Sequence, residues 1–182
     1  MIKKNPYQNP YQKGSPRLYG YDYSSDGLYF ITICIKDRLP YFGQIENNTI
    51  YPSKIGDIVI EEWLKTPELR KSMNIELDEF CIMPNHFHAI IKLGNPNLPS
   101  FDKRLPVSNH KPNIFGRQSQ NLSSIIRGFK GACTKRIHKE IDDSFQWQNR
   151  FHDHIIRDLD SLDSIRSYIQ NNPANWRDDE LM

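Results

Sequence analysis

Apolar residues along the chain fall into runs and stripes with two different periods. The run LYFITICI, from Leu28 to Ile35, is β-branched and aromatic without polar interruption, which is typical of a buried strand. Residues 74–83 and 86–93 also look like strands, and only the turn-forming pair Pro84-Asn85 separates them. They therefore predict a β-hairpin. Short strand pieces are also expected at 145–147 and 151–156.

Three other segments carry apolar residues at helical spacing. One stripe predicts a helix over 54–65, and a longer stripe predicts a second helix over 121–139. A last helix begins near residue 160 or 161 and ends near Asn172, because Pro173 disfavours helical geometry in the residue before it.

The order of these elements is strand, helix, strand, strand, helix, strand, helix. Hairpin-linked strands with few helices predict an α+β sandwich, in which a mostly antiparallel sheet packs against helices. The length of 182 residues suits one domain, which we expect over 28–176. An extended or flexible arm precedes it at 1–27, a long loop interrupts it at 94–120, and an acidic tail follows at 177–182.

Composition excludes several classes of protein. No run approaches the ~20 apolar residues of a membrane-spanning helix, and no apolar stretch follows the basic N-terminus as it would in a secretory signal. The three cysteines, Cys34, Cys81 and Cys133, are odd in number, widely spaced and set among apolar residues. They indicate reduced core residues of a cytoplasmic protein.

Positive charge is concentrated in one part of the chain. The net charge is only +2, but residues 100–157 contain eleven basic and five acidic residues. This block predicts a surface for nucleic acid, although a solvated charged surface would give the same pattern. Tyrosines of the arm can stack on bases or simply pack; they are Tyr7, Tyr11, Tyr19, Tyr21 and Tyr23. The candidate nucleic-acid-binding residues are Arg127, Lys130, Lys135, Lys139, Arg150 and Arg157.

Two histidines, His86 and His88, share one face of the second hairpin strand, because alternate side chains of a strand point the same way. Their Cα atoms are about 7 Å apart, so two ring nitrogens can converge on one metal ion. Histidines that pack without a metal are the alternative. His152 and His154 repeat this spacing, and a four-histidine zinc or iron site is a further possibility.

In the last predicted helix, Tyr168 and Asn172 lie one turn apart on one edge of the apolar stripe. If this helix packs on the sheet face that carries His86 and His88, a hydroxyl nucleophile and an amide oxygen meet a two-histidine site. A metal-polarised phosphate and a tyrosine can together break a phosphodiester by covalent catalysis. A purely structural tyrosine is the alternative.

Two sequence blocks resemble the signature motifs of the single-tyrosine HUH transposases, specifically the REP-associated tyrosine transposase branch. They are MPNHFH at 83–88 and SYIQNNP at 167–173. The segment WQNRFHDHIIR at 147–157 is similar to the family's segment before its tyrosine helix. The resemblance covers about residues 26–176.

The resemblance implies a ferredoxin-like fold and a metal-dependent endonuclease or strand transferase. Such an enzyme cleaves single-stranded DNA beside a hairpin through a 5′-phosphotyrosine intermediate. Tyr168 is then the nucleophile, and His86, His88 and Asn172 are the metal ligands. Mg²⁺ or Mn²⁺ is expected, because two imidazoles and an amide oxygen leave positions for phosphate and water. The expected partner is single-stranded or hairpin DNA, bound by a monomer or homodimer.

Two alternatives remain open at this point. One is a domesticated protein that binds hairpin nucleic acid and no longer cuts it. The other is a metalloenzyme built on the four-histidine site.

Overall fold

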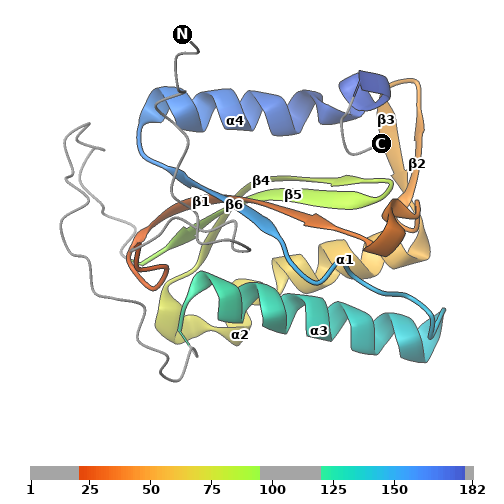
Figure 1. The fold of residues 1–182 in the computed structure, drawn as a ribbon, viewed down its shortest axis with the longest axis horizontal. Coiled ribbons are helices and arrows are strands. Elements are labelled where there is room, and N and C mark those ends of the chain that lie inside the picture. Colours follow the sequence, from red (N-terminus) through yellow and green to blue (C-terminus); the bar gives the residue numbers. More distant parts are fainter. Residues whose placement is uncertain (1–20, 95–119, 179–182) are drawn as a thin grey trace, which may run out of the picture.

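Four antiparallel strands form the central sheet of the protein in the computed structural model, which describes residues 21–94 and 120–178 (Figure 1). The strands are β1 (Gly27–Cys34), β4 (Glu76–Met83), β5 (His86–Leu93) and β6 (His152–Ile156), and their order across the sheet is β4-β5-β1-β6. Helix α1 (Lys54–Leu64) connects β1 to β4, and α3 (Leu122–Glu140) lies between β5 and β6. This βαββαβ order is the ferredoxin-like topology, so the predicted α+β class is confirmed.

Helices cover both faces of this sheet (Figure 1). Helices α1 and α3 lie on one face, and α4 (Leu159–Asn171) lies on the other. None of the helices in the described ranges is long and apolar enough to cross a membrane. The shorter elements are β2 (Gly43–Glu46), β3 (Thr49–Pro52), α2 (Thr66–Leu69) and the 3-10 helices η1 (Lys36–Arg38), η2 (Lys71–Met73) and η3 (Asn172–Asp178).

Alternation along the strands divides the apolar residues into two cores. Tyr29, Ile31 and Ile33 of β1 are fully buried in the larger core, under α1 and α3. Leu28, on the opposite face, joins a smaller core under α4 that also contains Ile90, Ile156, Leu162 and Ile169. Because both faces are covered, β1 appears in the sequence as an unbroken apolar run instead of an alternating one.

The end of the predicted N-terminal arm takes part in the larger core. Tyr23 is buried, and the Tyr21 hydroxyl lies 3.2 Å from that of Tyr29. Tyr21 and Tyr23 therefore pack within the protein, which was the alternative to stacking on bases. The other three tyrosines proposed to stack on bases, Tyr7, Tyr11 and Tyr19, lie outside the described residues, as do most of the arm and most of the loop predicted at 94–120.

The main differences from the prediction are short elements. The β2–β3 hairpin was not predicted, because its four-residue strands are mostly exposed and carry little apolar signal. Its turn residues Asn47 and Asn48 both have positive φ, which is the usual geometry of a two-residue hairpin loop. The strand piece expected at 145–147 is wrong in extent, since only an isolated bridge between Trp147 and Ile35 forms there.

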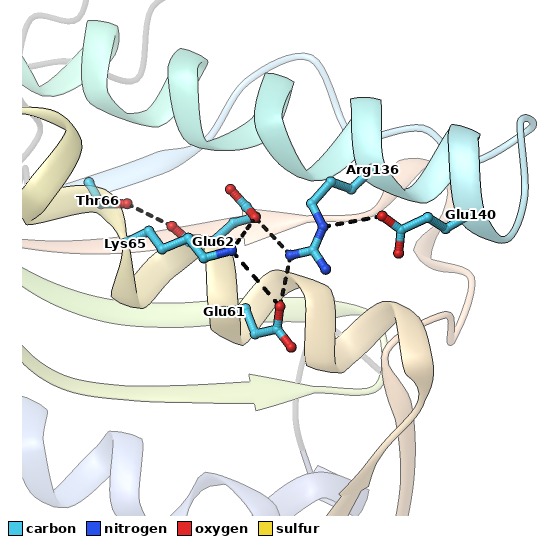
Figure 2. A network of polar contacts seen from close by, with 6 residues as sticks. All are labelled: Glu61, Glu62, Lys65, Thr66, Arg136 and Glu140. Carbon is cyan, nitrogen blue, oxygen red and sulfur yellow. Dashed lines mark hydrogen bonds and ion pairs between the residues drawn. The ribbon is translucent and has the colours of Figure 1, made fainter.

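A polar network joins α1 to α3 on the outer side of the larger core (Figure 2). One guanidinium nitrogen of Arg136 lies 2.8 Å from carboxylate oxygens of both Glu61 and Glu62, and Lys65 lies 3.1 Å from Glu62. Glu62 is only 8% exposed. Burial acts to raise the pKa of its carboxyl, but hydrogen bonds from Arg136 and Lys65 outweigh burial and leave this pKa below its ordinary value.

Replacing Arg136 by methionine is expected to lower the free energy of unfolding by about 1–3 kcal/mol at pH 7, because a buried carboxylate loses its main partner. A carboxyl with a lowered pKa adds stability above its unfolded pKa, and this stability is lost as pH falls through the folded value. The difference in free energy of unfolding between wild type and Arg136→Met should therefore become smaller in acid. Urea unfolding at several pH values measures it, with Glu140→Gln at the exposed end of the network as the control. Equal stabilities at pH 7 would contradict the prediction.

Candidate active site

The paired histidines lie at the start of β5, on the sheet face covered by α4. In the sheet register His86 lies opposite Cys34 of β1, and His88 lies opposite Thr32. Both imidazoles are buried, and their ring centroids are 4.5 Å apart. Strand alternation thus brings the two rings together as predicted.

A neighbouring oxygen orients each imidazole. Nδ1 of His86 lies 2.7 Å from Oδ1 of Asn85, and Nδ1 of His88 lies 2.9 Å from the Thr32 hydroxyl. Because an amide oxygen only accepts, Nδ1 of His86 must carry the proton, and its Nε2 has a lone pair. Burial, and then the positive charge of Arg38, lower the pKa of His86 to about 4. The ring is therefore neutral at pH 7, which is the form that binds metals.

Helix α4 brings the tyrosine to this pair. Its N-cap, Asp158, accepts a hydrogen bond of 2.7 Å from the Ser161 amide. Three turns later the Tyr168 hydroxyl lies 3.3 Å from Nε2 of His88, and the Tyr168 ring meets Phe30 edge-on at 6.1 Å. Tyr168 is 45% exposed, in contrast to the buried histidines. The tyrosine therefore lies at the boundary between the buried pair and the surface.

Asn172 ends α4 and begins η3, one turn after Tyr168. It is only 3% exposed, and its Oδ1 has no hydrogen-bond partner among the described residues. A buried amide oxygen in that state costs about 1–3 kcal/mol, which binding to a cation would offset. Trp176 of η3 lies 6.0 Å from the His86 ring, so this segment borders the histidines. Two buried imidazoles and an amide oxygen thus fit a divalent cation.

Polar contacts fasten α4 to the edge strand β4. Arg166 forms a two-pronged ion pair with Asp78, at 2.9 and 2.6 Å, and Gln170 donates to Glu79 at 3.1 Å. The hydrogen bonds from Arg166 lower the pKa of the Asp78 carboxyl. These contacts lie where the register of β4 against β5 shifts. They hold the tyrosine helix against this part of the sheet.

Replacing Arg166 by methionine is expected to loosen α4 without unfolding the sheet, because the larger core lies on the other face. Amide hydrogen exchange should speed up several-fold in α4, since local opening then costs less free energy, and stay unchanged in α1 and α3. Asp163→Asn is the control, because Asp163 is an exposed second partner of Arg166 at 3.4 Å. Unaltered exchange in α4 of Arg166→Met would show that the apolar contacts alone hold the helix.

The predicted nucleic-acid-binding residues fall into two separate groups. Arg127, Lys130, Lys135 and Lys139 belong to α3, across the sheet from Tyr168. Lys130 donates to the carbonyl of Gln148 and packs over the Trp147 ring, so it also has a structural role. Arg150 and Arg157 are exposed and flank β6, on the sheet that carries the histidines.

The four-histidine site is not formed. His152 lies opposite Thr32, and His154 lies opposite Phe30, so both share the sheet face of His88. Strand β1, however, separates β6 from β5, which places His152 about 10 Å from His88 along the sheet. Within 21–94 and 120–178, no three His, Cys, Asp or Glu side chains are grouped to hold a metal.

The remaining histidines and Lys92, which could also approach a phosphate or a metal, have ordinary surroundings where the structure describes them. Lys92 lies on the histidine face but pairs with Glu76 at 3.1 Å, and His138 contacts the Phe145 carbonyl at 2.8 Å. His110 lies outside the described residues. None of the three cysteines forms a disulfide, as predicted; Cys34 and Cys133 are buried, and Cys81 is half-buried.

Sequence reasoning missed the residues that support the site. They are Phe30, Thr32, Arg38 and Asn85. Asn85 was assigned only to the turn, although it contacts its direct neighbour His86. Thr32 was assigned only to a buried strand, because its contact with His88 depends on strand pairing. Arg38 lies in a short segment in which it and Asp37 have positive φ.

No protein-family model matches the sequence. An uncharacterized protein of Haemophilus influenzae is 38% identical over 178 residues, which cover 94% of this chain and 93% of that protein. A second H. influenzae protein, provisionally named a REP-associated tyrosine transposase, is 27% identical over 86% of this chain and 75% of its own length. The solved structure of a REP-associated tyrosine transposase bound to a REP hairpin shares the fold, with a TM-score of 0.56 and 18% identity over 86% of this chain and 72% of that one.

Proposed function

We propose that the chain is a REP-associated tyrosine transposase, which cleaves and rejoins single-stranded DNA beside a hairpin with Tyr168 as the nucleophile. The hairpin substrate is suggested by the solved relative, which was captured on a REP hairpin. The observation that carries the proposal is the partly exposed Tyr168 side chain, whose hydroxyl lies 3.3 Å from Nε2 of the buried His88.

In the proposed reaction the Tyr168 oxygen attacks the scissile phosphorus in line with the departing 3′-oxygen. An O–P bond forms at the tyrosine, the P–O3′ bond breaks, the phenol loses its proton and the 3′-oxygen gains one. The 5′-phosphotyrosine that results keeps a bond of similar energy, so the reverse attack by a 3′-hydroxyl can rejoin strands. The helix contacts described above hold the attacking oxygen in place.

His86, His88 and Asn172 would hold Mg²⁺ or Mn²⁺, which when bound supplies Lewis-acid polarisation of the scissile phosphate. The chain prepares its own ligands for this task. Asn85 and Thr32 fix the two rings through Nδ1, and burial keeps His86 neutral. The positive charge of Arg38 beside His86 adds attraction for the phosphate.

Covalent capture of DNA tests the proposal. A labelled hairpin library with single-stranded flanks is incubated with the protein and Mn²⁺, and a denaturing gel is examined for a protein–DNA adduct. We expect an adduct with Mn²⁺ and none after chelation with EDTA. Hairpin binding without any adduct would favour the alternative of a domesticated binding protein that no longer cuts.

The exposed basic residues of α3 are proposed to neutralise phosphates of the bound DNA. Changing Arg127, Lys135 and Lys139 together to alanine is expected to flatten the slope of log affinity against log salt concentration by up to about 2 units. The preferred hairpin should stay the same, because phosphate contacts position DNA without reading its sequence. Fluorescence anisotropy over a salt series measures the slope. If the triple variant has the same salt dependence as the wild type, these three side chains do not contact DNA phosphates.

A further inference from the structure

Within residues 21–94 and 120–178, one part of the active-site face of the sheet is left uncovered beside the tyrosine. The polar contacts of α4 with Asp78 and Glu79 fasten it over the β4 edge, and its apolar residues cover Ile90 and Ile156. At the opposite edge, His152 and His154 of β6 are exposed on the same face. The body of α4 thus covers one side of the Tyr168 hydroxyl, and the β6 side remains accessible.

Aromatic and imidazole rings connect this open edge to the nucleophile. His154 lies directly across from Phe30 in the register, and cross-strand partners share a face. The half-buried Phe30 ring stacks on His88 with centroids 5.4 Å apart and meets Tyr168 edge-on at 6.1 Å. The row therefore runs from His154 through Phe30 to the reacting hydroxyl. Flat rings in such a row are what unpaired bases stack on.

Charge along the same strand suits an anionic chain. Arg150 precedes β6, and Arg157 follows it. Both arginine side chains are exposed. Of the nearby carboxylates, Asp153 points to the other sheet face by alternation, and Asp158 caps α4. An arginine therefore stands at each end of β6, where the phosphates of a strand lying along it would pass.

We propose that the surface made by Phe30, His152 and His154, with Arg150 and Arg157 at its ends, binds the single-stranded nucleotides next to the scissile phosphate. A phosphate that reaches the Tyr168 hydroxyl has flanking nucleotides that must leave by an uncovered side, and β6 provides it. The rings stack on the bases, and the arginines pair with the phosphates. This inference rests on the proposed function and adds to it the path of the strand.

Two fluorescent probes test this surface: a blunt DNA hairpin, and the same hairpin with a short single-stranded thymidine extension. In the double variant His152→Thr/His154→Thr, threonine keeps the strand propensity of β6 while both rings are removed. We expect its affinity for the extended probe to fall about ten-fold, the size of one lost base–ring stack. Its affinity for the blunt hairpin should stay unchanged, which also shows that the variant is folded. Tyr51→Thr removes an exposed ring from β3, away from β6, and serves as the control.

A second measurement makes the test independent of these variants. The extended probe with iodouracil in place of thymine is photocrosslinked to the wild-type chain, and the crosslinked peptide is identified by mass spectrometry. Crosslinks within 150–157 support the proposed path. Equal affinities of the double variant and wild type for the extended probe, or crosslinks confined to α3, would overturn it. Both experiments measure binding, so a missing covalent adduct would count against cleavage alone and leave the strand path to be judged on its own.

Discussion

Tyr168→Phe is expected to abolish strand cleavage, with a loss of more than about a thousand-fold, because the substitution removes the only atom that forms the covalent bond. The ring itself remains, so its edge contacts with Phe30 and His88 persist. Since Tyr168 is 45% exposed, the loss of one hydroxyl should leave the fold intact. Hairpin affinity should therefore stay within about two-fold, as expected for an exposed polar change.

Tyr51→Phe gives a matched control for this experiment, because Tyr51 is another exposed tyrosine, at 52%, on the peripheral strand β3. Both variants are compared on a denaturing gel for the covalent adduct and by anisotropy for hairpin binding. The adduct should disappear only in Tyr168→Phe. If that variant still forms it, the nucleophile is a different side chain, and the adduct peptide identified by mass spectrometry would name it.

Local sequence periods were sufficient to predict each half of this site. Alternation along β5 places His86 and His88 on one face, and helical spacing places Tyr168 and Asn172 on one edge of α4. Whether the two halves meet depends on which sheet face α4 covers, and no local period contains that information. The contact between Tyr168 and His88 was therefore only a conditional prediction, which the packing of α4 fulfils.

Strand order explains what local patterns could not predict. His152 and His154 repeat the spacing of His86 and His88. From the sequence alone, both pairs are equally plausible as metal ligands. In the sheet, β1 lies between β5 and β6, so the second pair is too far from the first to complete a metal site. The same pairing brings Thr32 to His88 from a strand more than fifty residues earlier in the chain. Such partners become visible only once the strand order is known.

His86→Ala and His88→Ala are each expected to lower Mn²⁺ affinity by more than about 100-fold, since loss of a mere supporting hydrogen bond to a ligand already costs about 10- to 100-fold. Metal-dependent cleavage should disappear with the affinity. Asn172→Ala should weaken binding less, because a neutral amide oxygen is a poorer ligand than imidazole. Isothermal titration with Mn²⁺ measures all three variants.

Both imidazoles are buried, so each alanine variant leaves a cavity, and circular dichroism must show that it is folded before titration. His86→Asn and His88→Asn keep part of the volume of the imidazole, and they replace the alanine variants if those do not fold. His152→Ala is the matched control, because His152 lies on the same face of the sheet as His86 and His88 but belongs to β6 instead of β5. Its Mn²⁺ affinity should equal that of the wild type. Loss of affinity in His152→Ala would restore the four-histidine site, and unchanged affinity in folded variants of His86 or His88 would remove that residue from the metal site.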